Sequence, residues 1–516
     1  MLKIPLVTWI ANAAAVLTGA YGEVTLQAEV ADCSRQTIYD HAHKVQAAVV
    51  DAHDGGPTRA TVIAENQRLA CENAQLWQWL EETIEFPVIK QHEFAATAAA
   101  MGLSLNQILV LLALILGQQA CPGRSTLHRW IKLAGLAAGR VLKLLDARCR
   151  ALVLVGCLDE IVFHSRPVLV GVEPASLTWF LGQKADDRTG ATWAKALRDW
   201  DGLSFVIADA GKGLQAGIAM VRREREEDSK PTLESGLDVF HTTDEARRVL
   251  RLIWNRVERL WEQAEAASRR VKESQRQGQD ARGLARVAGR LWKQAEAAFA
   301  EYERSEAGWK IAHGVLAVFG AEGRLNDRDW ASQQIALALP LLWGGEWAKV
   351  RGLLQAEGAL TFLDRLHRQL SEAVPDDALR AELVRLWWLR RQRPRAKVSG
   401  EVAGAGHVMH LVQEVLCQKM DPNWRESYGA VSRVLRGTVR ASSAVECMNS
   451  VLRMHQSRHR TVSQGLLDLK RLYWNCREFR EGKRRRRCPY ELLGLKLPGY
   501  RFWDLLGMPT TPKGRA

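Results

Sequence analysis

Apolar residues gather in short runs about a third of the way along the chain. Three runs, rich in Val and Leu and each of strand length, occupy residues 152–157, 168–172 and 177–181. Turn-forming and polar residues separate them, so the pattern predicts a meander of three strands. Asp159, followed by Glu160, comes just after the first run, where a buried strand would emerge towards solvent.

The pattern changes after this meander. A helical segment, Thr192–Trp200, carries Trp and Leu on one side, and a fourth apolar run, Leu203–Ala208, ends at Asp209. A fifth strand is predicted at Leu237–Phe240 and ends at His241. The predicted order is three strands, a helix and two further strands, with an Asp after the first and the fourth strands.

Before the meander the apolar spacing predicts helices. Residues 26–31 form a first helix, and Ser34 caps a second one that begins one residue later. Such a pair resembles the helix-turn-helix of DNA-binding proteins, in which the second helix enters the major groove. The predicted DNA contacts are Arg35, Gln36 and Thr37. A helical hairpin with a polar face is the alternative.

A second helical unit is predicted between Phe94 and Leu145. Within it, Gly123 precedes another capped helix that is led by basic residues. The DNA contacts predicted there are Arg124, Ser125 and Arg129. The intervening amphipathic helix, residues 62–84, fits either a short coiled coil or packing on its own domain.

From residue 243 to about residue 393 the apolar spacing is helical almost throughout, and its many Trp residues indicate a packed core. We interpret this region as an all-helical insertion, after which the sheet domain is expected to resume at His407–Val415. A helix capped by Ser442 follows. One face of that helix carries Glu446, Asn449 and Arg453.

The charge balance points to polyanionic partners. The chain has 72 Lys and Arg against 58 Asp and Glu, a formal net charge of +14. Twelve basic residues against three acids lie between Arg453 and Arg487, interleaved with Tyr, Trp and Phe. This density favours a phosphate-contacting surface over a solvated face. The DNA contacts predicted in this run are Arg453, Arg458, Arg484, Arg485, Arg486 and Arg487.

Length and composition set further bounds. A chain of 516 residues predicts three or four domains. Its nine Cys residues form no C-x-x-C pair, so neither a disulfide framework nor a cysteine zinc site is indicated, and a reducing cytoplasm fits best. The apolar stretches at residues 5–20 and 108–117 are interpreted as buried helices, with no membrane association.

Three acids in this pattern suggest a chemistry. Asp159, Asp209 and Glu446, if brought together, would form an oxygen-only site for two Mg²⁺ or Mn²⁺ ions. Such a pair of ions supports in-line displacement at phosphorus. The chain has no Walker phosphate loop, G-x-S-x-G elbow or H-E-x-x-H motif.

Several segments resemble the DDE transposases of bacterial insertion sequences. They are Leu158-Asp159-Glu160 with Arg166–Val170, Ala208–Gly211, Ser443-x-x-Glu446-x-x-Asn449, and Gly465–Arg471 with Pro489–Gly494. The resemblance implies an RNase H-like core, in which the first and fourth strands are neighbours, with an all-helical insertion before the Glu. It also implies cleavage of double-stranded DNA at the element's terminal inverted repeats by water, and strand transfer into target DNA by the freed 3′-OH. A homo-oligomer on paired ends is expected.

Carried over residue by residue, the resemblance makes Asp159, Asp209 and Glu446 the catalytic, metal-binding triad. Residues 238–241 look like the Asp-x-x-His element of some of these enzymes, with His241 expected to position DNA. Asn449 is a further expected DNA contact. Glu160 and Glu426 remain rival ligands, since spacing alone does not choose between them.

The predicted fold is therefore an α/β RNase H-like catalytic core with a mixed sheet, N-terminal helix-turn-helix domains and a large all-α insertion, predominantly helical overall. The expected divisions are 1–60 (helix-turn-helix), 61–148 (helical linker and second unit), 149–242 (core, first part), 243–400 (insertion), 401–460 (core with the catalytic Glu) and 461–516 (basic region). A DNA transposase in the bacterial cytoplasm, at the nucleoid, is the leading hypothesis. A non-catalytic DNA-binding regulator or domesticated relative, and a non-mobile RNase H-like nuclease, are the alternatives.

Overall fold

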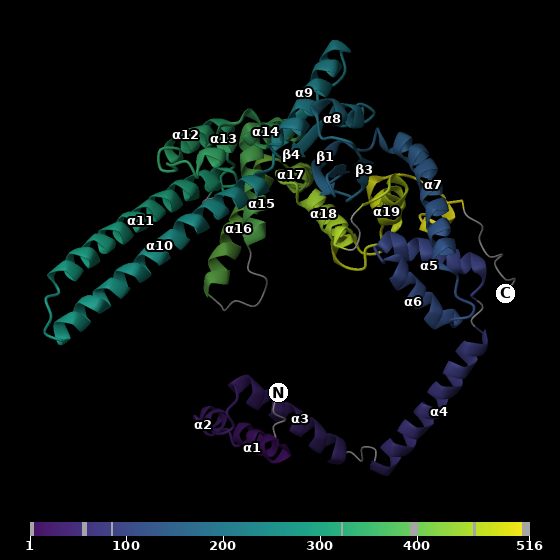
Figure 1. Ribbon diagram of the computed structural model, residues 1–516, viewed down its shortest axis with the longest axis horizontal. Helices are drawn as coiled ribbons and strands as arrows, with labels where there is room; N and C mark the ends of the chain where they lie inside the picture. Colours follow the sequence, from purple (N-terminus) through teal and green to yellow (C-terminus); the bar gives the residue numbers. More distant parts are fainter. Residues whose placement is uncertain are drawn as a thin grey trace. The chain divides into compact units, whose positions relative to one another are not determined.

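The computed structural model describes residues 5–53, 59–83, 86–320, 323–392, 401–457 and 461–507. The chain divides into two compact units, Met1–Phe86 and Pro87–Ala516 (Figure 1).

The first unit is helical. Its helices are α1 (Leu6–Leu17), α2 (Glu23–Val30), α3 (Arg35–His53) and α4 (Arg59–Thr83). The predicted turn and cap before α3 are confirmed, since the Ser34 hydroxyl accepts a hydrogen bond from the Thr37 backbone N–H at 3.1 Å. Ile38 is fully buried where α1, α2 and α3 pack together. The apolar side chains of α4 that the structure describes are exposed, so the choice between a coiled coil and local packing stays open.

The second unit contains one mixed sheet and many helices. The first helices are α5 (Val88–Met101), α6 (Leu105–Leu116) and α7 (Arg124–Cys149). The strands are β1 (Val155–Phe163), β2 (Arg166–Val172), β3 (Trp179–Lys184), β4 (Phe205–Ala208) and β5 (Glu234–Leu237), with α8 (Gly190–Leu197) and α9 (Lys212–Glu227) between β3 and β5. The strand order is β3-β2-β1-β4-β5. β2 is antiparallel to β1 and β3, whereas β4 is parallel to β1 and β5.

Two strand predictions were wrong. Asp159 does not follow the first strand but lies inside β1, because pairing with β2 continues as far as Phe163. The fifth strand ends at Leu237 rather than beginning there. Asp238 caps a helix whose first residues are Val239 and Phe240, so the apolar pair that suggested a strand belongs to a helical turn.

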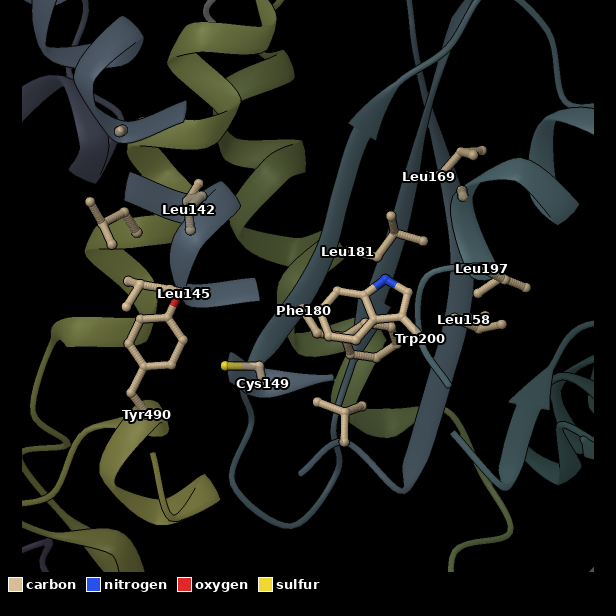
Figure 2. Close-up of a cluster of buried hydrophobic side chains, with 14 of the residues drawn as sticks. Leu142, Leu145, Cys149, Leu158, Leu169, Phe180, Leu181, Leu197, Trp200 and Tyr490 are labelled. Carbon is tan, nitrogen blue, oxygen red and sulfur yellow. The ribbon is translucent and has the colours of Figure 1, made fainter. Parts of the chain in front are cut away.

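The two faces of the sheet are covered by different helices. Cys157, Ile161 and Phe163 of β1 pack on one face with α18 (Ser443–Gln456). Leu158, one residue out of phase, packs on the other face with α7, α8, α9 and α19 (Gln464–Cys476). Figure 2 shows part of this second core, where the rings of Phe180 and Trp200 meet edge to face at 4.8 Å.

Between β5 and α18 the described part of the chain is mostly helical. The elements are α10 (Val239–Arg276), α11 (Arg282–Val315), α12 (Arg328–Ala338), α13 (Ala348–Gln355), η1 (Glu357–Ala359), α14 (Thr361–Ala373), α15 (Asp377–Gln392), α16 (Glu401–Met420) and α17 (Trp424–Gly437). α10 and α11 form a long antiparallel pair (Figure 1). The sheet domain does not resume at His407–Val415, because α16 and α17 pack with α14 and α15; the chain returns to the sheet at α18. The C-terminal elements are η2 (Gly482–Arg484), α20 (Pro489–Leu493) and α21 (Phe502–Leu505).

No helix in the described part of the chain has the length and apolarity of a membrane span. The two apolar stretches do form helices, as predicted, but each buries only one side. α6 buries Ile108 and Leu112 but exposes Leu114, and α1 exposes Val7.

Close contact between α7 and α19 gives a stability prediction. A Cβ atom on Gly135 would lie 2.6 Å from the Gly465 carbonyl oxygen, whereas a Cβ on Gly289 in α11 would meet nothing within 4 Å. Gly135→Ala is therefore expected to destabilise the protein by about 1–3 kcal/mol through overpacking. Gly289→Ala should stabilise it by up to about 1 kcal/mol through helix propensity. Chemical denaturation of both variants checks this, and equal stability of the two would contradict the α7–α19 contact.

Candidate metal centre

The parallel pairing of β1 and β4 sets Asp159 and Asp209 side by side along the chain direction. The pairing runs from Val155 opposite Phe205 to Leu158 opposite Ala208, and each Asp is the next residue. The expected adjacency of the first and fourth strands is thus confirmed. The Asp209 carboxylate accepts a hydrogen bond from the Gly211 backbone N–H at 3.0 Å, which fixes it in the turn before α9.

Helix α18 brings Glu446 to the same place. Val445 and Met448 anchor the helix on β1 and β2, so the neighbouring face turns towards Asp159. Asn449 is 1 % exposed, and its side-chain N–H donates to Asp159 Oδ2 at 2.5 Å. Glu446 Oε2 accepts a hydrogen bond from Arg453 at 3.2 Å.

The first turn of α10 supplies a third side chain, that of His241. The turn is pinned on both sides, because the Asp238 N–H donates to the Ala208 carbonyl at the end of β4 and the Val239 N–H donates to the Arg440 carbonyl before α18. The buried Asp238 carboxylate accepts the Phe240 N–H at 2.7 Å and the hydroxyl of Ser442.

Asp159, His241 and Glu446 form a compact donor group. One ligand atom from each lies within 4.8 Å of the others. His241 Nε2 lies 3.7 Å from Glu446 Oε1 and 3.6 Å from Asp238 Oδ2, too far for hydrogen bonds. Among the described residues, this buried Nε2 and the Asn449 Oδ1 have no hydrogen-bond partner. The two carboxylates and the imidazole nitrogen fit a divalent cation, which would satisfy groups that are costly to leave unpaired.

The raised pKa of Asp159 agrees with a site whose negative charges lack a balancing cation. This pKa is raised to about 6, chiefly by burial and also by the nearby charges of Asp209 and Glu446, which together outweigh the lowering effect of the Glu160 N–H and of His241. Asp209 is outside the three-residue group but close enough to act on the pKa of Asp159.

The rival acids lie elsewhere. Glu160 follows Asp159 in β1 and therefore faces the opposite side of the sheet, where it accepts hydrogen bonds from Arg188 at 3.0 Å and Trp193 at 3.3 Å. Glu426 is exposed on α17, among the insertion helices. Neither is a member of the donor group.

The predicted DNA-contacting residues are scattered over several surfaces. Arg35 and Gln36 are exposed and Thr37 is half-buried at the start of α3, and Arg124, Ser125 and Arg129 are exposed on α7. In the basic run, Arg484 donates to the carbonyls of Pro174 and Ala175, whereas Arg485, Arg486 and Arg487 are exposed, the last in an ion pair with Glu491. Arg453 is committed to Glu446, and Arg458 lies outside the described residues.

Sequence reasoning did not identify Asp238 and Ser442 as supports of the site. The pair Asp238–Ser442 joins the start of α10 to the start of α18 across 204 positions of sequence. The available signal was local: each residue is of a type that caps helices, and each precedes a helix.

Comparisons of the chain with protein-family models, curated proteins and solved structures found no match.

Proposed function

We propose that this protein is a metal-dependent DNA transposase of the DDE type, which cleaves DNA at insertion-sequence ends and joins the freed strand to target DNA. The observation that carries the proposal is the convergence of Asp159 and Glu446, with Asp209 at the position matching Asp159 on the neighbouring strand, just beyond the last residue pair of β1 and β4. Unpaired buried donors at that point support a bound cation.

Each residue has a role in this proposal. Asp159 and Glu446 hold the ion, Asn449 orients the Asp159 carboxylate, and Asp209 completes the anionic wall from the neighbouring strand. Mg²⁺ or Mn²⁺ bound here would activate the attacking oxygen and stabilise the leaving 3′ oxygen. The carboxylates would hold the cation, and the cation would offset the repulsion between these carboxylates and the DNA phosphates.

The fold and charge are consistent with this function. A five-stranded mixed sheet with its first and fourth strands adjacent, followed by a helical insertion and a helix that returns a Glu to the sheet, suits an RNase H-like core. The net charge of +14 suits a DNA partner. The helix pair α2–α3 supports DNA reading by the first unit, with Arg35 and Gln36 exposed at the start of the second helix.

The proposal is tested with the DNA that flanks the gene. Full-length protein, labelled DNA ends and Mg²⁺ or Mn²⁺ should yield nicked or cut ends, followed by strand-transfer products into a second duplex. Cleavage without transfer would instead indicate a nuclease. Metal-independent, specific binding without cleavage would indicate a regulator, and either result would overturn the proposal.

The basic run gives a separate prediction on DNA affinity. Arg485 and Arg486 are exposed, whereas Arg484 is tied to two backbone carbonyls. The double variant Arg485→Ala, Arg486→Ala should weaken DNA binding at all sequences and reduce the salt slope of log K by about 2. Affinity measured between low and moderate salt checks this, and an unchanged slope would make these arginines a solvated surface. Arg484→Ala is the comparison. It should lower the free energy of unfolding, because Arg484 is bonded to backbone carbonyls, and should leave the salt slope nearly unchanged.

A further inference from the structure

His241 differs from every acid in the candidate site because it offers nitrogen. Its Nε2 is buried, although the side chain as a whole is 37 % exposed, and it faces the carboxylates of Asp238 and Glu446 at 3.6 and 3.7 Å. A nitrogen at this range from two carboxylate oxygens forms no hydrogen bond with either. Something else must satisfy it, or it stays desolvated at a cost.

The two oxygens of Asp238 are already used, one by the Phe240 N–H and the other by the Ser442 hydroxyl. Asp238 therefore holds the first turn of α10 in place and is not counted as a ligand. The hydrogen bonds from the Asp238 and Val239 backbone to β4 and to the segment before α18 hold that turn against the site. His241 is in this way positioned by the backbone beside Glu446.

A second, independent observation points to the same ligand. Asn449 is 1 % exposed, its amide nitrogen is bonded to Asp159, and within the described chain its Oδ1 has no partner. A buried amide oxygen without a partner thus belongs to the residue that holds the Asp159 carboxylate, and the unpartnered His241 nitrogen belongs to the donor group itself. A divalent ion bound by Asp159, His241 and Glu446 would give the imidazole nitrogen a partner and balance the two carboxylate charges.

We propose that His241 is a direct nitrogen ligand of the ion held by Asp159 and Glu446, which makes this a mixed nitrogen and oxygen site rather than an all-carboxylate one. The role of the ion in DNA cleavage rests on the proposed function, whereas the binding of the ion by His241 does not. Imidazole favours Co²⁺, Zn²⁺ and other transition ions, whereas carboxylates alone suit Mg²⁺. The site should therefore discriminate more strongly against Mg²⁺ than its acids alone would.

The test measures ion binding by the metal-free, full-length protein without DNA. Co²⁺ is titrated by its visible absorption and Mg²⁺ by calorimetry, for the wild type, His241→Ala and His241→Gln. The expected result is a loss of Co²⁺ affinity of about tenfold or more in both variants, as for removal of a metal-site residue, with a much smaller loss for Mg²⁺. The exposed His128 on α7 gives the control, and His128→Ala should bind both ions as the wild type does.

An unchanged ratio of Co²⁺ to Mg²⁺ affinity in the His241 variants would overturn the assignment. If a variant is poorly folded, spin-echo spectroscopy of Mn²⁺ bound to the wild type decides instead, because a coordinated imidazole gives a directly bound ¹⁴N signal and an oxygen-only site gives none. Failure of the proposed function is a distinct result: a protein that cuts no DNA but shows the His241-dependent preference for Co²⁺ keeps the nitrogen ligand and loses the transposase.

Discussion

Asp159→Asn is expected to abolish metal-dependent cleavage of DNA ends while DNA binding persists. The substitution removes the negative charge of a buried ligand without changing its size, and Asn449 still lies against it. Loss of an ion that contributes several kcal/mol to the transition state corresponds to a fall in rate on the order of 1,000-fold. Initial cleavage rates at saturating Mn²⁺, with DNA affinity measured in parallel, check this result.

Glu160→Gln is the matched control, one residue along the same strand. Its carboxylate is on the opposite face, where it accepts hydrogen bonds from the exposed Arg188 and from the Trp193 indole, and an ion pair with one solvent-exposed partner contributes little to stability. Glu160→Gln should cleave DNA as the wild type does. Full activity of Asp159→Asn, or equal loss in both variants, would remove Asp159 from the proposed site.

Asp159→Asn, which should abolish cleavage, is expected to stabilise the metal-free protein at alkaline pH. The pKa of Asp159 is raised from 3.8 to about 6, so its contribution to stability is complete below its ordinary pKa and is lost as the pH rises through about 6. Without divalent ions, Asp159→Asn should therefore melt at a higher temperature than the wild type at pH 8. The difference should disappear near pH 4, which thermal unfolding in a chelator at both pH values would show.

Local physics explains which elements the sequence could predict. The Ser34 cap, the meander of three strands and the start of α18 follow from short-range patterns, and the structure agrees with them. The predicted cap by Ser442 was wrong, because its side chain makes no capping hydrogen bond and its hydroxyl donates to Asp238 instead. The length of β1 does not follow from such patterns, because the strand continues through Asp159 and Glu160 only where β2 supplies hydrogen-bond partners. Tertiary pairing thus overrides the tendency of two acids to end a strand.

The candidate site was partly predictable for a similar reason. The apolar runs located the two Asp residues, the resemblance to DDE transposases implied that the first and fourth strands are neighbours, and the pairing of β1 with β4 agrees with that adjacency. The contact of Asn449 with Asp159 spans 290 positions, and no spacing rule predicts it. His241 was expected to position DNA; its unpaired nitrogen within the donor group is visible only once α10 and α18 are packed together.

The number of residues after Asp209 did not show whether Glu446 or Glu426 is the third acid of the site. A pair of substitutions tests which one it is. Glu446 and Glu426 are both separated from Asp209 by the helices of the insertion. The number of residues between Asp209 and either Glu therefore does not indicate which Glu lies close to it. The structure distinguishes them, because Glu446 belongs to the donor group and Glu426 is exposed on α17. Glu446→Gln is therefore expected to lower cleavage by at least about 100-fold, equivalent to roughly 2.7 kcal/mol.

Glu426→Gln should leave both cleavage and Mn²⁺ affinity unchanged. Glu446→Gln should instead weaken Mn²⁺ binding, because the carboxylate within 3.7 Å of His241 Nε2 loses its charge while the side chain keeps its length. It also removes the partner of Arg453, which then becomes free to contact a phosphate, so DNA affinity should be retained or slightly raised. Loss of cleavage in Glu426→Gln with normal activity in Glu446→Gln would reverse the assignment and move the metal centre away from α18.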